Sequence, residues 1–269
     1  MDAKAVRHYH LTAEQGDAKA QYSLAEMYFY GDGVSQNYAE AAEWFRLAAE
    51  QGNVDAQIDL GVMYVNGEGV PQDEAEGVEW FHLAADQGDA RAQFNLGGMY
   101  KRGGERVPQD DVEAAEWFRL AADQGHIGAQ YKLGQMYFDG AGVSQDYAEA
   151  VRWYRLAAVQ GHNDAQFTLG WMYDEGEGVP QDYAEAVRWY RLTAEQGDVG
   201  SQLNLGRMYE DGKGVLRDDV EAYIWFSLAT RGLDGVASMR DETGSRLSSV
   251  DLVAAQQEAA RRLKIMRSR

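Results

Sequence analysis

Apolar side chains recur along the chain with the spacing of an amphipathic α-helix. In residues 53–88, one helical face collects four apolar residues at spacings of four, three and one: Ala56, Leu60, Met63 and Tyr64. The same residue types return at the matching positions of the neighbouring segments. The pattern predicts a helix of about fourteen residues, roughly 20 Å long at 1.5 Å per residue.

A second helical segment follows each of these after a glycine-rich turn. Within it, Trp80, Leu83 and Ala84 share a helical spacing, and the sequence predicts them as its buried face. The segment ends at Gln87-Gly88, after which the next first helix begins. Each unit is therefore predicted to consist of two antiparallel helices joined by a short turn.

The Gln-Gly dipeptide marks a repeat. Its glycines, closed by a degenerate Arg231-Gly232, are separated by 36, 36, 37, 36, 36 and 35 residues: Gly16, Gly52, Gly88, Gly125, Gly161, Gly197 and Gly232. A period in this range is the signature of a stacked-repeat protein, in which each unit buries its apolar face against its neighbours.

These patterns predict an all-α fold, an α/α superhelix (solenoid) of stacked antiparallel helix pairs, as a single domain over residues 1–269. The last helix is predicted at Ser248–Lys264. The expected parts are a half repeat at 1–16, six full repeats at 17–52, 53–88, 89–125, 126–161, 162–197 and 198–232, and a C-terminal helical cap at 233–269.

A glycine interrupts the first helix directly after its buried leucine in five of the full repeats, and Ala25 replaces it in the first full repeat. Glycine costs about 1 kcal/mol against alanine inside a helix, so its recurrence indicates a close approach of a neighbouring helix. The alanine indicates that size, rather than an unusual backbone angle, sets the limit. The glycines are Gly61, Gly97, Gly134, Gly170 and Gly206.

Each turn between the two helices carries glycines that are expected to end the first helix in a left-handed cap. The turn closes on Asn or Asp, and a Glu follows three residues later, the arrangement of a capping box. These pairs are Asn37/Glu40, Asp73/Glu76, Asp110/Glu113, Asp146/Glu149, Asp182/Glu185 and Asp218/Glu221. A phosphate-binding loop is excluded because no strand precedes the glycines and no Lys-Ser/Thr follows them.

Charge and composition limit the classes of molecule that the chain is expected to bind. The net charge of −19 argues against nucleic acid and against anionic membrane surfaces, whose phosphates it repels. It fits either the solubility of a long exposed array or attraction to a basic protein or peptide, and both explanations stay open. No apolar run is long enough to enter a membrane. The opening residues lack the apolar core of a secretory signal, which favours the cytoplasm; the periplasm or secretion stays open if the N-terminus is truncated.

The sequence predicts no catalytic residue, no cofactor and no metal site. Cysteine is absent, which excludes disulfides and thiolate metal ligands. His126 and His162 stand at equivalent positions at the start of the first helix, a full repeat apart and too distant to share one metal ion. The spacings indicate no Ser-His-Asp arrangement. We therefore predict that the chain is not an enzyme.

The repeated motif AQxxLGxMYxxGxGVxxDxxEAxxWxxLAAxQG is similar to the Sel1-like repeat, a relative of the tetratricopeptide repeat, over residues 1–232. The resemblance implies an α/α superhelix and a role as an adaptor or scaffold that holds other proteins together, in bacterial signalling, envelope processes and host contact and in eukaryotic protein quality control. Two alternatives stay open. One is small-molecule binding or hydrolase activity, described for a cysteine-rich branch whose cysteines this chain lacks. The other is a purely structural, self-associating spacer, although a monomer is favoured.

Positions that vary between units form a stripe on the first helix at i, i+3 and i+7. The resemblance implies that the first helix lines a concave surface, so we expect this stripe to bind a protein or peptide. Trp171 is the largest residue on it, and a lone aromatic there is typical of an interface anchor, with packing against the next repeat as the alternative. The predicted contact residues are Glu26, Tyr30, Val62, Asn66, Asn95, Arg102, Lys132, Gln135, Thr168, Trp171, Glu175, Asn204 and Arg207.

Overall fold

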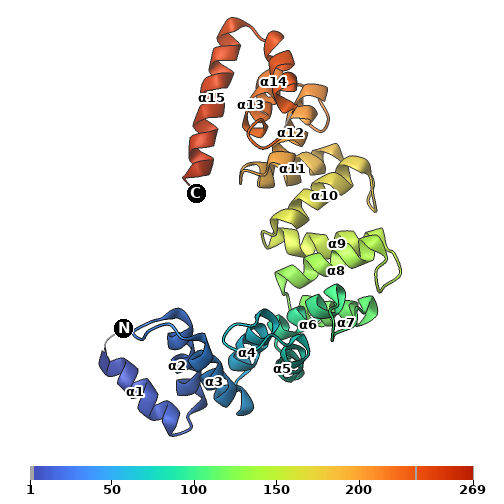
Figure 1. Cartoon of the computed structure of the whole chain (residues 1–269). Coiled ribbons are helices and arrows are strands. Elements are labelled where there is room, and N and C mark those ends of the chain that lie inside the picture. Colours follow the sequence, from blue (N-terminus) through green and yellow to red (C-terminus); the bar gives the residue numbers. More distant parts are fainter. Residues whose placement is uncertain (1–2, 234, 269) are drawn as a thin grey trace. The chain divides into compact units, whose positions relative to one another are not determined.

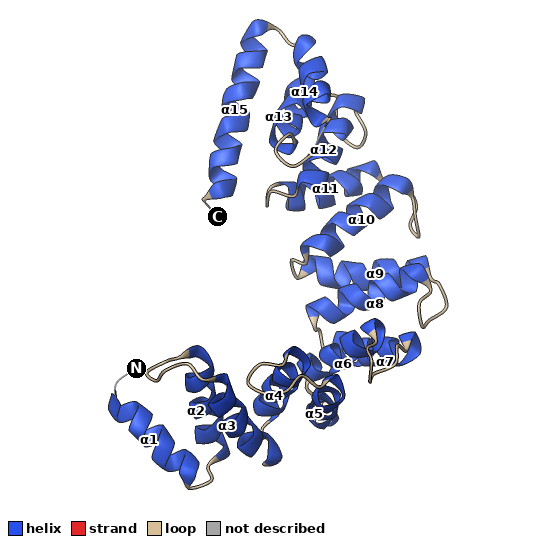
Figure 2. Ribbon diagram, in the orientation of Figure 1, coloured by secondary structure: helices blue, strands red, loops and turns tan. Residues whose placement is uncertain are grey.

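The computed structural model of the chain describes residues 3–233 and 235–268, and over these ranges it contains fifteen α-helices and no strand (Figures 1 and 2). The helices are α1 (Ala3–Glu14), α2 (Ala18–Tyr30), α3 (Tyr38–Glu50), α4 (Val54–Asn66), α5 (Glu74–Asp86), α6 (Ala90–Arg102), α7 (Asp111–Asp123), α8 (Ile127–Asp139), α9 (Tyr147–Val159), α10 (Asn163–Glu175), α11 (Tyr183–Ala194), α12 (Val199–Asp211), α13 (Asp219–Ala229), α14 (Val236–Ser245) and α15 (Ser249–Arg267).

The helices pack in sequence order, which confirms the predicted all-α fold of stacked helix pairs. We call the even-numbered helices α2 to α12 the A helices and the odd-numbered helices α1 to α13 the B helices. The chain divides into two compact units, Met1–Gln145 and Asp146–Arg269, each with its own buried core. Whether the whole chain acts as a single domain stays a prediction.

The buried face of the A helices is the predicted one, whereas that of the B helices agrees with the prediction only in part. Ala56, Leu60, Met63 and Tyr64 are all buried in the first unit. On α5, however, Phe81 and Ala85 are buried, whereas the exposed fraction of Leu83 is 48%. Ala84 of the expected trio is buried and Trp80 is half-buried, so only the leucine was wrong on α5. The trio one residue further along, Phe81, Ala84 and Ala85, has the same helical spacing and supplies the rest of the buried face.

The recurring glycine of the A helices meets an aromatic ring. A β-carbon added at Gly97 would lie 2.6 Å from the ring of Phe118, and one added at Gly170 would lie 2.7 Å from that of Tyr190. These distances are too short for real contacts, so glycine lets the B helix of the same repeat press its aromatic residue against the A helix backbone. The predicted close approach is confirmed.

The turn between the helices caps both of them. Gly67 ends α4 in the left-handed conformation, with a φ of 73°, as predicted. The Asp73 side chain accepts hydrogen bonds from the backbone N–H groups of Ala75 (3.0 Å) and Glu76 (3.2 Å), which opens α5. The Asp73 N–H donates to the carbonyl of Tyr64 at 2.9 Å. This N–H is the donor that Glu76 would bind in a full capping box, so only the first half of the predicted box forms here.

In the first three full repeats, a buried glutamine of the A helix binds the glutamine of the Gln-Gly dipeptide, a pairing that the sequence did not predict; in the repeat 162–197, Oε1 of Gln166 has no partner among the described residues. Gln57 is buried on α4, and its Nε2 donates to the carbonyl of Ala49 at the end of α3 (3.0 Å). Its Oε1 accepts a hydrogen bond from Nε2 of Gln87, in the Gln-Gly dipeptide of its own repeat, at 2.8 Å. Buried polar groups need such partners. This bond therefore explains why Ala-Gln and Gln-Gly recur together.

The equivalent histidines at the start of two A helices are caps rather than ligands. Nδ1 of His126 accepts a hydrogen bond from the N–H of Ala129 at 3.1 Å, and the ring stacks on Phe94. His162 caps α10 in the same way through Ala165. Burial lowers the pKa of His126, against the opposing charge of Asp89, and so favours the neutral form that can accept this bond.

Acidification should therefore destabilise the first unit through His126. The unfolded chain binds the proton at a pKa of about 6.5 and the folded one at a lower pKa, so stability is lost as the pH falls through this range. Replacing His126 by Asn, a cap at any pH, should reduce the loss between about pH 7.5 and pH 5 by roughly 1 kcal/mol. Urea unfolding of both proteins at the two pH values measures the loss of stability. Equal losses in the two proteins would show that the His126 cap does not cause it.

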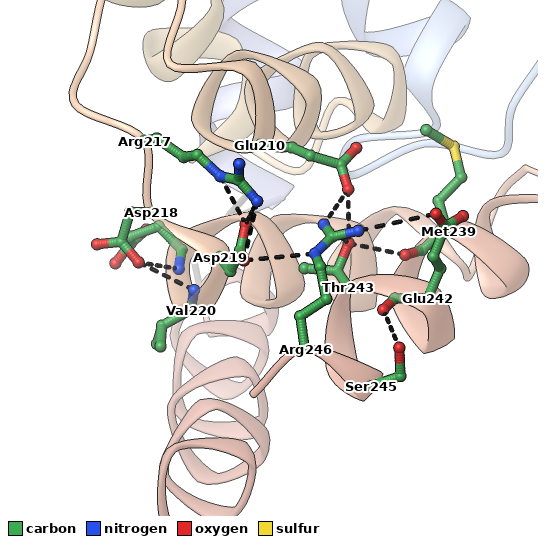
Figure 3. A network of polar contacts seen from close by, with 11 residues as sticks. Glu210, Arg217, Asp218, Asp219, Val220, Met239, Glu242, Thr243, Ser245 and Arg246 are labelled. Carbon is green, nitrogen blue, oxygen red and sulfur yellow. Dashed lines mark hydrogen bonds and ion pairs between the residues drawn. The ribbon is translucent and has the colours of Figure 1, made fainter. Parts of the chain in front are cut away.

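Polar side chains fasten α14 to the last repeat in the second unit (Figure 3). The Arg246 guanidinium pairs with Glu210 of α12 and, at 3.3 Å, with Asp219 of α13. The Thr243 hydroxyl donates to the same Glu210 at 3.0 Å. Charge-assisted bonds of this kind are stronger than neutral ones. These contacts hold α14 as a polar cap on the end of the repeat array, where a solvent-facing cap is needed.

The predicted last helix is present as α15, with Ser248 as its N-cap. Its Arg262 binds Glu221 of α13 through two nitrogens, at 2.9 and 2.6 Å. The same guanidinium lies over the ring of Trp225, 5.2 Å from its centre. Arg262 thus docks α15 on the last B helix, whereas Arg261 pairs with Glu258 of α15 itself at 2.6 Å.

Candidate functional site

Three pockets open at the same register of the repeat, each between the A helices of two consecutive repeats. Their floors are the aromatic residues of the intervening B helices: Phe45 in pocket I, Phe118 in pocket II and Tyr190 in pocket III. Pockets I and II belong to the first unit and pocket III to the second. Their volumes are about 200, 280 and 380 Å³.

The walls of the pockets come from matching positions but differ in chemistry. On the leading A helix, the two stripe positions are Glu26 and Tyr30 in pocket I, Gly98 and Arg102 in pocket II, and Trp171 and Glu175 in pocket III. On the following A helix, they are Asp59 and Val62, Lys132 and Gln135, and Asn204 and Arg207. The repeated residues build the pocket, and the varying residues decide what it presents.

The structure thus gathers ten of the thirteen predicted contact residues into three groups, and no predicted residue is buried. Asn66, Asn95 and Thr168 line none of these pockets; the Thr168 hydroxyl donates to the carbonyl of Asp164 in its own helix. Asp59 is a wall residue that the prediction omitted, although it lies on the variable stripe. Whether these residues bind a partner stays a prediction.

Pocket I is acidic and aromatic. The hydroxyl of Tyr22 lies 3.3 Å from Oε1 of Glu26 and 3.2 Å from Oδ2 of Asp59, so it joins two carboxylates of successive A helices. Burial raises the pKa of Asp59, and the charges of Glu26 and Asp55 add to the shift. Burial and the two carboxylates also hold the pKa of Tyr22 far above its usual range.

Pocket II is cationic at the same register. Lys101 pairs with Asp111 at 3.1 Å and Arg102 with Glu74 at 3.3 Å, both with substantial solvent exposure. Lys132 donates to Oε1 of Gln135 at 3.2 Å. Exposed pairs of this kind contribute about 0–1 kcal/mol, so these cations can exchange partners at low cost.

Pocket III combines an indole with mixed charges. Trp171 is half-buried and packs against the core of the second unit, so it serves packing as well as lining the pocket. Opposite, Lys213 pairs with Asp211 at 3.3 Å. Burial raises the pKa of Asp174, and the charge of Glu175 adds to the shift. Substitution of Trp171 by alanine would therefore disturb stability together with any binding.

Within residues 3–233 and 235–268, no three or more His, Asp or Glu side chains come together in a way that could hold a metal ion. Over the same ranges, none of the helices combines the length and the apolar character needed to cross a membrane.

The helix pairs and the pockets at a fixed register define an α-helical repeat protein. The family model described as Sel1 repeat matches residues 2–17, 18–53, 54–89, 90–126, 127–162, 163–198 and 199–232. The chain therefore belongs to the Sel1 repeat family, a family of repeat scaffolds.

Solved structures of bacterial proteins resemble the chain. One is c5321, a protective antigen of uropathogenic Escherichia coli with an SLR fold, at 39% identity and a TM-score of 0.84 over 95% of this chain and 56% of the antigen. Another is a Sel1 repeat protein from Oxalobacter formigenes, at 31% identity and a TM-score of 0.67, over 80% of this chain and 86% of that protein. The immunity protein Pa5087 of Pseudomonas aeruginosa matches at 21% identity and a TM-score of 0.44, over 80% of this chain and 81% of that protein. The chain thus spans about half of the antigen's length. No curated protein matches significantly.

Proposed function

We propose that the chain is a non-enzymatic scaffold that binds a protein or peptide along its A helices. One observation carries this proposal: residues that vary between repeats gather into pockets whose floors and frames are built by residues that recur. Helix packing by itself would favour the same wall residues in every repeat. Binding of a partner that contacts successive pockets would favour different wall residues in each, as in other repeat proteins with extended binding surfaces.

The exposure of the walls supports contact with a large partner rather than an enclosed ligand. Tyr30 is 66% exposed beside pocket I, and Val62 is 37% exposed on the next A helix. Aromatic residues are enriched among the few positions that dominate binding energies. The negative charge of the chain further favours a partner segment that carries basic residues.

Peptide selection tests the proposal without a known partner. Peptides are selected on the wild-type chain from a random displayed library, and their affinities are then measured for the Tyr30→Ala and Leu83→Ala variants. Both variants remove a large exposed side chain of the first unit, one on an A helix and one on a B helix. We expect Tyr30→Ala to weaken at least part of the selected peptides by about tenfold or more, or about 1.4 kcal/mol, and Leu83→Ala to leave them unchanged.

Two outcomes would count against this function. Failure to select any peptide would remove its support. Peptides that lose affinity with Leu83→Ala but not with variants of the three pockets would place the binding surface on the B helices.

A further inference from the structure

The carboxylates of pocket I lack a cation. Glu26 and Asp59 form no ion pair with any side chain of residues 3–233 or 235–268, and both carboxylates contact the hydroxyl of Tyr22. Arg91 is the cation whose charge reaches Asp59, but its guanidinium is bound to Asp55 at 2.6 Å and Asp89 at 2.7 Å. One shared hydroxyl proton offsets little of two negative charges, so the pocket has an unbalanced negative potential.

The other walls of pocket I are suited to an organic cation. Phe29, Tyr30 and Phe45 line it, with ring centres 5.1 Å apart for Phe29 and Tyr30 and 6.4 Å apart for Phe29 and Phe45. Aromatic faces attract ammonium and guanidinium groups, and they also pack against the methylene groups that carry them. A bare metal ion would gain nothing from these rings.

The volume of pocket I fits one side chain. It is about 200 Å³, whereas pockets for free small molecules usually span about 300–1,000 Å³. At the matching positions of pocket II, Lys132 replaces Asp59, Arg102 replaces the uncharged Tyr30, and Gly98 replaces Glu26. Within the first unit, pocket I is therefore the more acidic of the two at the same register.

We propose that pocket I holds the side chain of a lysine or arginine from an extended segment of the partner protein. Its ammonium or guanidinium donates to the carboxylates of Glu26 and Asp59, and its methylene groups lie against Tyr30 and Val62. This inference rests on the proposed function and adds the chemistry of the residue that this part of the surface recognises.

Blocked amino acids test the pocket directly. N-acetyl-arginine methylamide and N-acetyl-lysine methylamide are titrated into the whole chain at low ionic strength, with the uncharged N-acetyl-norleucine methylamide as comparison. The methyl signals of Val62 and the ring signals of Tyr30 are followed by NMR. We expect saturable shifts with the two cations that added salt weakens, and none with the norleucine compound.

A charge-matched pair of variants separates the pocket from the overall charge. Glu26→Gln/Asp59→Asn removes two charges but keeps the shape of the pocket, and Glu43→Gln/Asp86→Asn removes two charges at exposed sites of the B helices α3 and α5. The first double variant should weaken cation binding by at least about tenfold, and the second by less than about twofold. Equal behaviour of the two variants, or no saturable shift in the wild type, would overturn the inference.

The selected peptides distinguish this inference from the proposed function. Peptides that bind the A helices without a lysine or arginine preference, and that bind Glu26→Gln/Asp59→Asn as well as wild type, would leave the function standing and the inference wrong. If blocked arginine binds but no peptide does, pocket I takes a free organic cation, and its assignment to a partner segment is wrong.

Discussion

Replacing Gln57 with alanine is expected to lower the free energy of unfolding by about 2–4 kcal/mol. Gln57 is 4% exposed and holds two partners in place, the carbonyl of Ala49 and the side chain of Gln87. Its loss removes one hydrogen bond to the Ala49 carbonyl, which keeps the bond from the Gly52 N–H at 2.9 Å, at about 0.5–1.5 kcal/mol, and it opens a cavity between the repeats, which contributes the larger part of the cost. Urea unfolding followed by circular dichroism measures the difference.

The partner glutamine provides the control for this change. Gln87 is exposed, so water can replace its hydrogen bond to Gln57, and we expect Gln87→Ala to cost less than about 1 kcal/mol. If Gln57→Ala costs as little as Gln87→Ala, the buried glutamine does not fasten the repeats.

Two adjacent glycines of α6 should respond in opposite directions to the same substitution. A β-carbon at Gly97 would meet the Phe118 ring at 2.6 Å, whereas one at Gly98 would have no atom within 4 Å. Gly97→Ala should therefore cost about 1–3 kcal/mol through overpacking. Gly98→Ala should gain up to about 1 kcal/mol from the better helix propensity of alanine.

The first repeat limits the size of the effect at Gly97. Ala25 takes the corresponding place there and is fully buried beside Phe45, so an alanine is accommodated where the neighbouring side chains suit it. Thermal and urea unfolding of the two single variants decide the matter. Stabilisation by both substitutions would mean that ring contact does not constrain the A helix.

The sequence was sufficient for those features whose causes are local and repeated. The end of α4 at Gly67 and the start of α5 at Asp73 follow from backbone conformation and capping, which a few neighbouring residues determine. The A helix face follows from a pattern that only one register satisfies. The close approach at Gly97 was predictable because a costly residue recurred at one place.

Features that depend on contacts between helices were harder to predict from the sequence. Two trios of the B helix share one spacing, so periodicity could not decide between Leu83 and Phe81 as the buried residue. The Gln57–Gln87 bond joins residues 30 positions apart, and both belong to motifs that recur in nearly all repeats, so variation gave no signal. Likewise, the Asp73 N–H has two possible acceptors, and only the packed structure shows that Tyr64 receives it.

The site was predictable in outline but not in its grouping. Variation along the A helix gave the stripe, although the position of Phe29, Lys101 and Asp174 also varies and lines the pockets. Variation between repeats could not show that the Tyr22 hydroxyl bridges Glu26 and Asp59, because Tyr22 lies outside the stripe and Asp59 belongs to the next repeat. It also could not separate Asn66, Asn95 and Thr168 from the residues that line pockets I, II and III.

Each pocket takes its two walls from successive repeats, and this sets how the protein can be recombined. Glu26 and Asp59 contribute to one cavity but belong to different 36-residue modules. A graft cut at the Gln-Gly junctions would move half of one cavity and half of the next. An engineer who wishes to transplant a specificity should instead cut within the A helices, out of step with the folding module.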